Sequence, residues 1–402
     1  MAPLYTASAP SRRTRARTSS FSSNALLSSL STTSSATAIA APAPKPAPTM
    51  VSIKTLSLLD FKNAATRPRF LQEMRDSLME IGTFYIRDHG IAGEITDDAM
   101  KTVQDYFALP LEEKKKMLIG NSRHFRGYKL IGEEFTNSQV DHREQLQFGP
   151  EQQPLESFQP GQSLNYEGLQ GPNQWPRSTL ELLPSFQPVI LDFMQRLEQL
   201  SQTLMEAVAL SLGLDQDFFR TMFGPDPYYR LKCAKYPSVP HEKEAKIGCG
   251  AHKDTGFLTL LLQDMVGGLQ GQDPVTGQWM DTRPIPESFI VTMGESVERL
   301  TGGLYHATVH RVLNNTSGYD RYSIPFFFDP ALSQTIPHSI QDLNQSKVLD
   351  FEEALENAMT KMTTDEKKGE TEVEGWSNGA HIFETVHRCH PEVYARWYDK
   401  EL

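Results

Sequence analysis

The segment Arg230-Leu231-Lys232-Cys233-Ala234-Lys235-Tyr236 decides the fold, because its side chains alternate between polar and apolar over most of its length. A period of two is typical of a β-strand with one face buried. Four later segments, 257–262, 289–293, 304–313 and 322–328, have the same character, and turn-forming residues separate them. Short strands at this spacing predict a double-sheet jelly roll rather than a parallel sheet.

The sequence before this segment favours helices. Apolar residues recur at helical spacing over 66–82, ahead of a buried strand at 83–86, and a long helix is predicted after Pro188 and ends at Gly213. The segment 122–176 is rich in Gly, Pro, Asn and Gln, and we expect it to be mostly loop. The predicted fold class is therefore mainly β with flanking helices, a double-stranded β-helix core packed against N-terminal and long central helices.

The composition changes along the chain. The first fifty residues are rich in Ser, Thr, Ala and Pro, and no acidic residue precedes Asp60. An Arg-rich, acid-poor start is typical of a transit peptide for a mitochondrion or plastid; a disordered tail, or a start at Met50 with a cytoplasmic location, is the alternative. We expect four parts: an extension at 1–51, a helical and loop region at 52–225, the jelly-roll core at 226–330 and a helical tail at 331–402.

Composition also excludes several classes of protein. The chain has 402 residues, and none of its apolar runs approaches the roughly 18 residues that a membrane span needs. Three cysteines without CxxC spacing exclude a disulfide framework and a thiolate zinc site. A net charge of −11 argues against a nucleic-acid partner. We expect a small-molecule substrate, no membrane partner, and a monomer or weak homodimer.

The segment Gly250-Ala251-His252-Lys253-Asp254-Thr255-Gly256 carries the candidate chemistry. Residues two apart on a strand point to the same side, so His252 and Asp254 project together. The third ligand is His306 or His310, which lie four residues apart and would point to the same side of a strand. Two imidazoles and one carboxylate form the facial triad of non-haem Fe(II) oxygenases, although the same set can also hold zinc.

A second pair of residues favours His310 over His306 as the third ligand. Arg321 and Ser323 follow His310 after a turn and share a strand face, where a guanidinium and a hydroxyl make a carboxylate clamp. Fe(II), Asp254, a dicarboxylate such as 2-oxoglutarate and Arg321 together carry no net charge. A buried site tolerates such a neutral set far better than an isolated charge.

Taken together, these residues resemble the isopenicillin N synthase-like family of 2-oxoglutarate and Fe(II)-dependent dioxygenases over roughly residues 53–402. Further motifs carry the resemblance: Gly82-Thr83-Phe84-Tyr85-Ile86, Asp88-His89-Gly90-Ile91, Gly171-Pro172-Asn173-Gln174-Trp175-Pro176, Gly267-Gly268-Leu269-Gln270, Thr301-Gly302-Gly303, His310-Arg311-Val312 and Arg321-Tyr322-Ser323-Ile324-Pro325-Phe326-Phe327.

The resemblance implies a role for each of the central residues. His252, Asp254 and His310 would bind Fe(II), while Arg321, Ser323 and Tyr236, the last in a Tyr-Pro pair, would bind 2-oxoglutarate. The implied reaction uses O₂ to hydroxylate or desaturate a small organic metabolite, of the kind found in secondary metabolism, and converts 2-oxoglutarate to succinate and CO₂. The chain departs from the family in two places: many members have Asn at the position of Ala234, and Gly-Asp where this chain has Gly294-Glu295.

The substrate is not defined by the sequence. By analogy with the family, the aromatic residues Phe125, Tyr128, Phe326 and Phe328, with Phe135, are the candidates for its pocket, and each could equally be a core residue. Arg126 and Arg143 are candidates for holding an acidic group of the substrate.

Two other functions remain compatible with these residues. An iron oxidase or cyclase of the same fold would use O₂ without 2-oxoglutarate, although the intact Arg321 and Ser323 pair argues against it. A non-catalytic binding protein on this fold would be expected to have lost a residue of the triad, and the triad is complete.

Overall fold

The computed structural model describes residues 52–137, 139–159, 164–239, 247–340 and 376–399. The chain divides into two units, Met1–Thr49 and Met50–Leu402, and all the described residues belong to the second unit. The predicted extension at 1–51 therefore lies outside the described residues.

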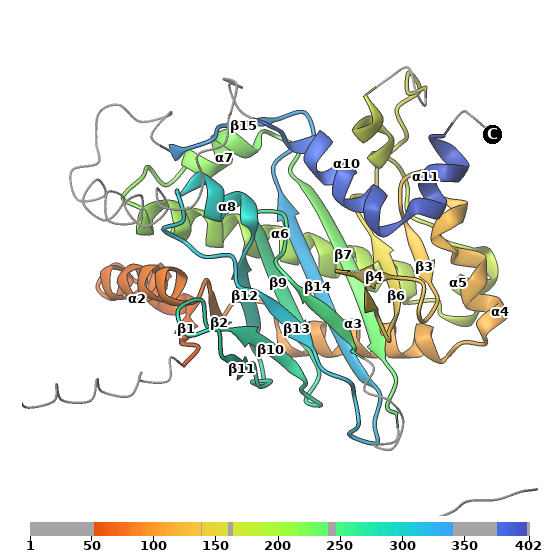
Figure 1. Ribbon diagram of the computed structural model, residues 1–402, viewed down its shortest axis with the longest axis horizontal. Helices are drawn as coiled ribbons and strands as arrows, with labels where there is room; N and C mark the ends of the chain where they lie inside the picture. Colours follow the sequence, from red (N-terminus) through yellow and green to blue (C-terminus); the bar gives the residue numbers. More distant parts are fainter. Residues whose placement is uncertain (1–51, 138, 160–163, 240–246, 341–375, 400–402) are drawn as a thin grey trace, which may run out of the picture. The chain divides into compact units, whose positions relative to one another are not determined.

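Two β-sheets form the core of the second unit (Figure 1). Within the described residues, the larger sheet has the strand order β1-β2-β12-β9-β14-β7-β6-β3, and the smaller has the order β11-β10-β13-β8. The strands of the larger sheet are β1 (Thr55–Ser57), β2 (Thr83–Arg87), β12 (Phe289–Met293), β9 (Leu258–Gln263), β14 (Arg321–Asp329), β7 (Tyr228–Tyr236), β6 (Glu144–Phe148) and β3 (Gly127–Lys129). Those of the smaller sheet are β11 (Trp279–Asp281), β10 (Leu269–Gln272), β13 (His310–Val312) and β8 (Cys249–His252). The short pairs are β4 (Phe135–Thr136) with β5 (Gln139–Val140), and β15 (Thr335–Ile336) with β16 (Trp376–Ser377).

Helices surround the sheets and differ widely in length. They are α1 (Leu58–Lys62), α2 (Arg67–Glu80), α3 (Gly93–Ala108), α4 (Leu111–Lys114), α5 (Arg177–Leu182), α6 (Phe186–Ser211), α7 (Phe218–Phe223), α8 (Glu295–Leu300), α10 (Asn378–Cys389) and α11 (Pro391–Trp397). Short 3₁₀ turns occur at η1 (Lys115–Met117), η2 (Ile119–Asn121) and η3 (Asn165–Leu169).

The long helix α6 supports the face of the large sheet that points away from the small sheet. Its apolar stripe, which includes Leu197, Leu204 and Val208, is fully buried, and it contacts β9 and β14 as well as α2 and α3 (Figure 1). Gly213 follows its C-terminus with φ of +74°, a left-handed conformation that glycine adopts without strain. The long central helix and its end are as predicted.

The strand at 304–313 is shorter than predicted. Only His310–Val312 is a strand, because Gly302 and Gly303 have φ of +59° and +82° and turn the chain away from the sheet. The backbone N–H of His306 then bonds the carbonyl of Leu78 in α2, at 3.0 Å, rather than a neighbouring strand. The apolar residues between Gly303 and His310 are therefore buried under α2 instead of in a β-ladder.

The segment 122–176 contains two strands of the large sheet that we predicted as loop. β6 pairs with β7 through Leu146 opposite Cys233, and β3 pairs with β6. All five residues of β6 are buried although Glu144, Gln145 and Gln147 are polar, so the strand lacks the apolar alternation that sequence reasoning requires. Because β1, β2, β3 and β6 all precede residue 226, the N-terminal region supplies part of the sheet as well as helices.

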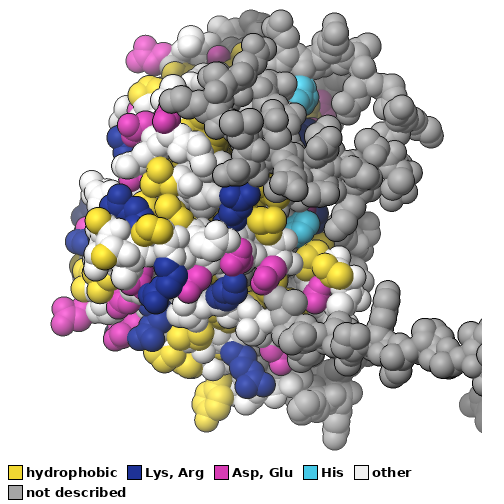
Figure 2. All heavy atoms as spheres, turned by 90° about the vertical axis from the view of Figure 1, so that its left-hand side faces the viewer, with side chains coloured by type: hydrophobic (Ala, Val, Ile, Leu, Met, Phe, Trp, Pro, Cys, Tyr) yellow, Lys and Arg dark blue, Asp and Glu magenta, His cyan; other side chains and the backbone are white. Residues whose placement is uncertain are grey.

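The described surface carries both signs of charge. On the face shown in Figure 2, Lys and Arg side chains lie among Asp and Glu side chains, with no large field of either sign. Among the described residues, no helix combines the length and the apolar character needed to cross a membrane.

Candidate active site

His252, Asp254 and His310 converge between the two sheets. His252 is the last residue of β8, Asp254 lies two residues further on, and His310 begins β13 directly opposite His252. One ligand atom from each of the three lies within 4.8 Å of the others. The Nε2 atoms of His252 and His310 are 3.9 Å and 3.7 Å from Oδ1 of Asp254. This is the predicted set of two imidazoles and one carboxylate, and it fits a single metal ion.

Hydrogen bonds orient each of these three side chains. Nδ1 of His252 is 2.8 Å from the carbonyl oxygen of Gly250, and Nδ1 of His310 is 3.0 Å from that of Thr308. A proton on Nδ1 leaves the lone pair on Nε2, which faces the other ligands. The hydroxyl of Thr259 donates to Oδ2 of Asp254 at 2.7 Å, so Oδ1 is left for the metal.

The protonation states suit metal binding. Burial and the neighbouring His252 lower the pKa of His310, which favours the neutral imidazole that can donate a lone pair. Burial alone would raise the pKa of Asp254, but His310 and His252 lower it, which favours the carboxylate. Both ligands therefore adopt the ionisation state that a metal ion requires.

Two other side chains near the triad are not ligands. His306 lies apart from the cluster, with Nδ1 3.7 Å from Oε1 of Glu298. Burial raises the pKa of the Cys249 thiol to about 12, so the sulfur is protonated at neutral pH; it lies 3.8 Å from Nδ1 of His252, on the side of the ring away from the metal position.

A cavity between the two sheets, which we call the central cavity, connects the triad with the predicted co-substrate residues. Its wall includes His252, Asp254 and His310 together with Tyr236, Arg321 and Ser323. The remaining wall is largely apolar, with Leu261, Leu269, Ile290 and Val312 among its residues. An apolar lining lowers the effective dielectric constant, which strengthens the electrostatic interactions made inside the cavity.

Arg321 is prepared to bind an anion in the central cavity. Its side chain is buried, and its Cζ lies 4.9 Å from the ring centroid of Tyr236. Nη2 of Arg321 donates to Oε1 of Gln263 at 3.0 Å, and Nη1 donates to Oγ of Ser323 at 3.3 Å. Its Nε has no hydrogen-bond partner, and no carboxylate within the described residues forms an ion pair with it. A buried guanidinium with unused donors fits the distant carboxylate of 2-oxoglutarate.

Four of the five predicted aromatic pocket residues lie in the hydrophobic core, which corrects the prediction for them, whereas Phe135 lines a hollow beside the triad. Phe326 and Phe328 belong to the main hydrophobic core and Tyr128 donates to Glu144 there, while Phe125 lies in a second cluster with Phe383. The reason is strand parity. Arg321 and Ser323 face the cavity, so the same face of β14 carries Phe327, which lines the cavity, whereas Phe326 and Phe328 point into the opposite face.

A second hollow adjoins the triad and does not have Arg321 in its wall, and we call it the outer hollow. It shares five residues with the central cavity, which are Arg143, Lys232, His252, Asp254 and Phe327. The rest of its wall comes from β4, β7, helix α10 and residues next to these elements or to the triad, and includes Phe135, Thr136, Asn137, Arg230, Arg388 and His390. His252 and Asp254 therefore border two hollows, and Arg321 belongs to the wall of only the first of these two.

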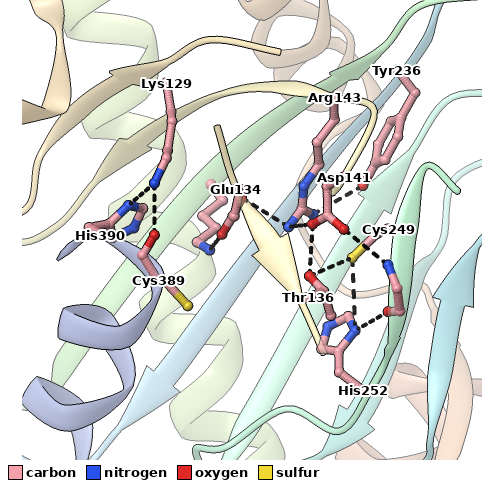
Figure 3. A network of polar contacts seen from close by, with 12 residues as sticks. Lys129, Glu134, Thr136, Asp141, Arg143, Tyr236, Cys249, His252, Cys389 and His390 are labelled. Atoms are coloured by element: carbon pink, nitrogen blue, oxygen red, sulfur yellow. Dashed lines mark hydrogen bonds and ion pairs between the residues drawn. The ribbon is translucent and has the colours of Figure 1, made fainter. Parts of the chain in front are cut away.

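The two arginines that were candidates for binding an acidic group of the substrate already form hydrogen bonds or ion pairs within the protein. Arg126 lies away from both hollows and donates to Leu169 O and the hydroxyl of Tyr228. Arg143 borders both hollows, but its Nη2 is 3.0 Å from Glu134 and 3.0 Å from Asp141. Figure 3 shows this network continuing from Asp141 through Thr136 and Cys249 to His252. Arg143 thus positions the loop beside the triad.

The site includes residues that sequence reasoning missed. Thr259 donates to Asp254 of the triad, and Gln263 accepts from Arg321 of the clamp. Phe327 lines the central cavity. Phe327 could have been found, because it has the same parity as Arg321 on one strand. Thr259 and Gln263 lie on β9: Thr259 follows Asp254 by five residues, and the pairing of β9 with β14 places Gln263 opposite Ser323.

Comparison with known proteins agrees with this geometry. Residues 53–178 match the N-terminal domain described as non-haem dioxygenase in morphine synthesis, and residues 225–330 match the 2OG-Fe(II) oxygenase superfamily. A 1-aminocyclopropane-1-carboxylate oxidase of Dictyostelium discoideum is 31% identical, covering 73% of this chain and 87% of the relative. A 2-oxoglutarate-dependent dioxygenase of a Dothideomycetidae species is 36% identical, covering 73% and 79%. A Neurospora crassa crystal structure with α-ketoglutarate and thymine has a TM-score of 0.65 at 22% identity, covering 83% and 96%.

The chain therefore belongs to the 2OG-Fe(II) oxygenase superfamily. The predictions of a jelly-roll core, of an oxidoreductase, and of Fe(II), 2-oxoglutarate and O₂ as its cofactor and co-substrates are confirmed at the level of the family. The family assignment also selects iron over zinc for the triad.

Proposed function

We propose that this chain oxidises a C–H bond of a small organic metabolite, by hydroxylation or desaturation, while converting 2-oxoglutarate and O₂ to succinate and CO₂. In the hydroxylation, one oxygen atom of O₂ enters the product and the other enters succinate. One observation carries the proposal: the triad and the unfilled donors of Arg321 open onto the same buried cavity.

Each residue of the site has a role in this proposal. His252, Asp254 and His310 hold Fe(II), which supplies the activation of O₂ when it is bound. Arg321 binds the distant carboxylate of 2-oxoglutarate, with Ser323 as a second donor and Tyr236 as the ring on which the guanidinium rests. Gln263 accepts from Nη2 of Arg321 and so fixes the plane of the guanidinium. This arrangement directs the keto-acid end of the co-substrate toward the triad.

The substrate occupies the outer hollow in this proposal. Phe327 separates it from the clamp, since its side chain borders both hollows. A bound substrate would cover His252 and Asp254 from the side opposite Arg321 and exclude water from the triad. Orientation of the reacting C–H bond and removal of water are the two contributions that the protein makes to this chemistry.

The experiment measures succinate and substrate loss together. Protein loaded with Fe(II) is incubated with 2-oxoglutarate and metabolite extracts, and products are sought at mass shifts of about +16 or −2, the values for hydroxylation and desaturation. We expect one succinate for each substrate oxidised. A product formed without succinate would contradict the proposal and favour an oxidase that does not use 2-oxoglutarate.

A matched pair of arginine variants tests the clamp. Arg321→Gln removes the buried guanidinium, and we expect the KM for 2-oxoglutarate to rise about 10- to 100-fold, the range for losing a charged hydrogen-bonding partner. Arg311→Gln is the control, because Arg311 lines neither hollow and its Cζ lies 3.9 Å from the ring centroid of Trp279. Equal effects of the two substitutions would show that the first acts through general destabilisation.

A further inference from the structure

The outer hollow is lined by five cationic side chains, and one of them differs from the rest. Four form ion pairs: Arg143 with Glu134 and Asp141, Lys232 with Glu134, Lys253 with Glu298, and Arg388 with Glu384. Arg230 forms no ion pair and no hydrogen bond with any described residue. Among the described residues it is therefore the cation in this wall that lacks a directly paired carboxylate, although its charge lowers the pKa of the buried Asp254 and Asp329.

Arg230 is also buried, which makes its isolation costly. Its exposed fraction is 6%, and its Nε has no hydrogen-bond partner. Its Cζ lies 5.2 Å from the ring centroid of Phe327, the residue directly opposite it on β14. A guanidinium carries five N–H donors in a plane, so a buried one without an acceptor lacks most of its possible hydrogen bonds. Such a group is typical of a site that is completed by a ligand.

Its position links this unused group to the reaction. Arg230 has the parity of Lys232 and Tyr236 on β7, so it projects to the cavity side of the large sheet. It lines the same hollow as His252 and Asp254, whereas Arg321 lines only the central cavity of the two. Two buried arginines thus flank the triad, one in each hollow.

We propose that Arg230 binds a carboxylate group of the substrate, so that the substrate is an organic acid whose carbon skeleton lies along Phe327 with a C–H bond facing the triad. This inference rests on the proposed function, and it adds the chemical class of the substrate. A carboxylate fits because it accepts two parallel N–H bonds from a guanidinium whose face is covered by a ring. Phe327 provides the apolar contact for the rest of the molecule.

A structural role for Arg230 is the competing explanation, with Asp329 as its counterion. The two residues are diagonal neighbours, since Arg230 pairs with Phe327 and Asp329 pairs with Tyr228. However, Asp329 accepts its described hydrogen bond from the backbone N–H of Phe257 at 2.9 Å, and its Oδ2 has no partner. No ion pair joins Asp329 to Arg230, so each side chain keeps unused hydrogen-bonding capacity.

The test uses binding rather than turnover. Protein loaded with Mn(II) in place of Fe(II), saturated with 2-oxoglutarate and kept free of O₂, is titrated by calorimetry with a panel of aliphatic and aromatic monocarboxylates. Each acid is compared with its own methyl ester, which has nearly the same shape and no charge. We expect at least one acid to bind about 10- to 100-fold more tightly than its ester, the range for a buried charge-assisted pair.

Three variants identify the residue responsible. Arg230→Gln should bring the acid-to-ester affinity ratio close to one, and Arg230→Lys should keep part of it. Arg388→Gln removes a cation from the same hollow that is exposed and already paired, and it should leave the ratio unchanged. The Kd for 2-oxoglutarate is measured in every sample, because a variant that fails to fold would lose this binding as well.

The outcomes separate the two proposals. If the unsubstituted protein with Mn(II) does not bind 2-oxoglutarate, the proposed function fails. If it binds 2-oxoglutarate but no acid in the panel exceeds its ester, or if phosphate monoesters bind and carboxylates do not, only the carboxylate assignment is overturned. A ratio that survives in Arg230→Gln would also overturn the assignment and leave Arg230 with a structural role beside Asp329.

Discussion

His310 lies directly opposite His252 in the antiparallel pair of β13 and β8, and the centroids of their rings are 4.3 Å apart. Each ring nitrogen Nδ1 bonds the carbonyl of the residue two positions earlier, Thr308 for His310 and Gly250 for His252. The orientation of each ligand is therefore set locally by its own strand. The pairing of the two strands brings the ligands together.

The choice between His310 and His306 can be tested with one pair of substitutions. His310→Ala should abolish tight Fe(II) binding and reduce kcat/KM by at least about 100-fold, because it removes one of three ligands. His306→Ala should retain both, since His306 faces Glu298 and lies outside the cluster. The measurements are metal stoichiometry after dialysis and succinate formation; metal loss in the second variant and not in the first would contradict the assignment.

Thr259 is expected to tune the affinity for the metal without contacting it. Thr259→Val removes the hydroxyl that donates to Oδ2 of Asp254 while keeping the shape of the side chain. We expect the Kd for Fe(II) or Mn(II) to rise about 10-fold, the lower end for loss of an outer-shell hydrogen bond. Thr292→Val is a matched control in the same cavity, because its hydroxyl lies 3.3 Å from that of Thr83 rather than beside a ligand. Equal changes in the two variants would count against the role of Thr259.

Neighbouring phenylalanines on β14 should give opposite phenotypes. Phe326 is fully buried in the main core, so Phe326→Ala should lower the free energy of unfolding by about 3–5 kcal/mol, the cost of a large cavity. Phe327 lines both hollows, so Phe327→Ala should cost less stability and raise the KM for the substrate. Urea unfolding and steady-state kinetics measure the two effects. A larger change in KM for the first variant would restore the original prediction that Phe326 lines the pocket.

Asp329 should make stability depend on pH. Burial raises its pKa to about 6 from the ordinary value of 3.8, so the folded chain binds this proton more tightly than the unfolded chain does. The resulting stabilisation is complete below about pH 4 and is lost as pH rises through about 6. Asp329→Asn removes this dependence, so the variant should gain roughly 3 kcal/mol relative to the parent between these limits, an upper estimate from two units of pKa.

Urea unfolding of both proteins at several pH values between about 4 and 8 measures this difference. Comparing the pair cancels the titration of all other groups, provided that they titrate alike in both. A difference that stays constant with pH, or that moves in favour of the parent as pH rises, would show that folding does not raise the pKa of Asp329.

Several elements could be predicted because their signals are local. The stripe of α6, the alternation in β7 and the His252-x-Asp254 pair each depend on residues close together in the chain. The strand β6 could not be recognised, because its polar residues Glu144 and Gln145 are buried by partners from other segments. Lys114, the last residue of α4, pairs with Glu144 at 2.6 Å, for example, although the two residues are 30 positions apart in the sequence.

The sequence by itself determined the reaction class, since a triad and an arginine clamp need only the right residue types at the right parity on predicted strands. Tertiary structure decided which side chains share a hollow. It placed Phe327 rather than Phe326 beside the triad, paired Arg143 with Glu134 and left Arg230 without an ion pair to a described residue. The physical reason is that parity and periodicity act over a few residues, whereas burial and charge pairing depend on strands that meet only when the sheets close.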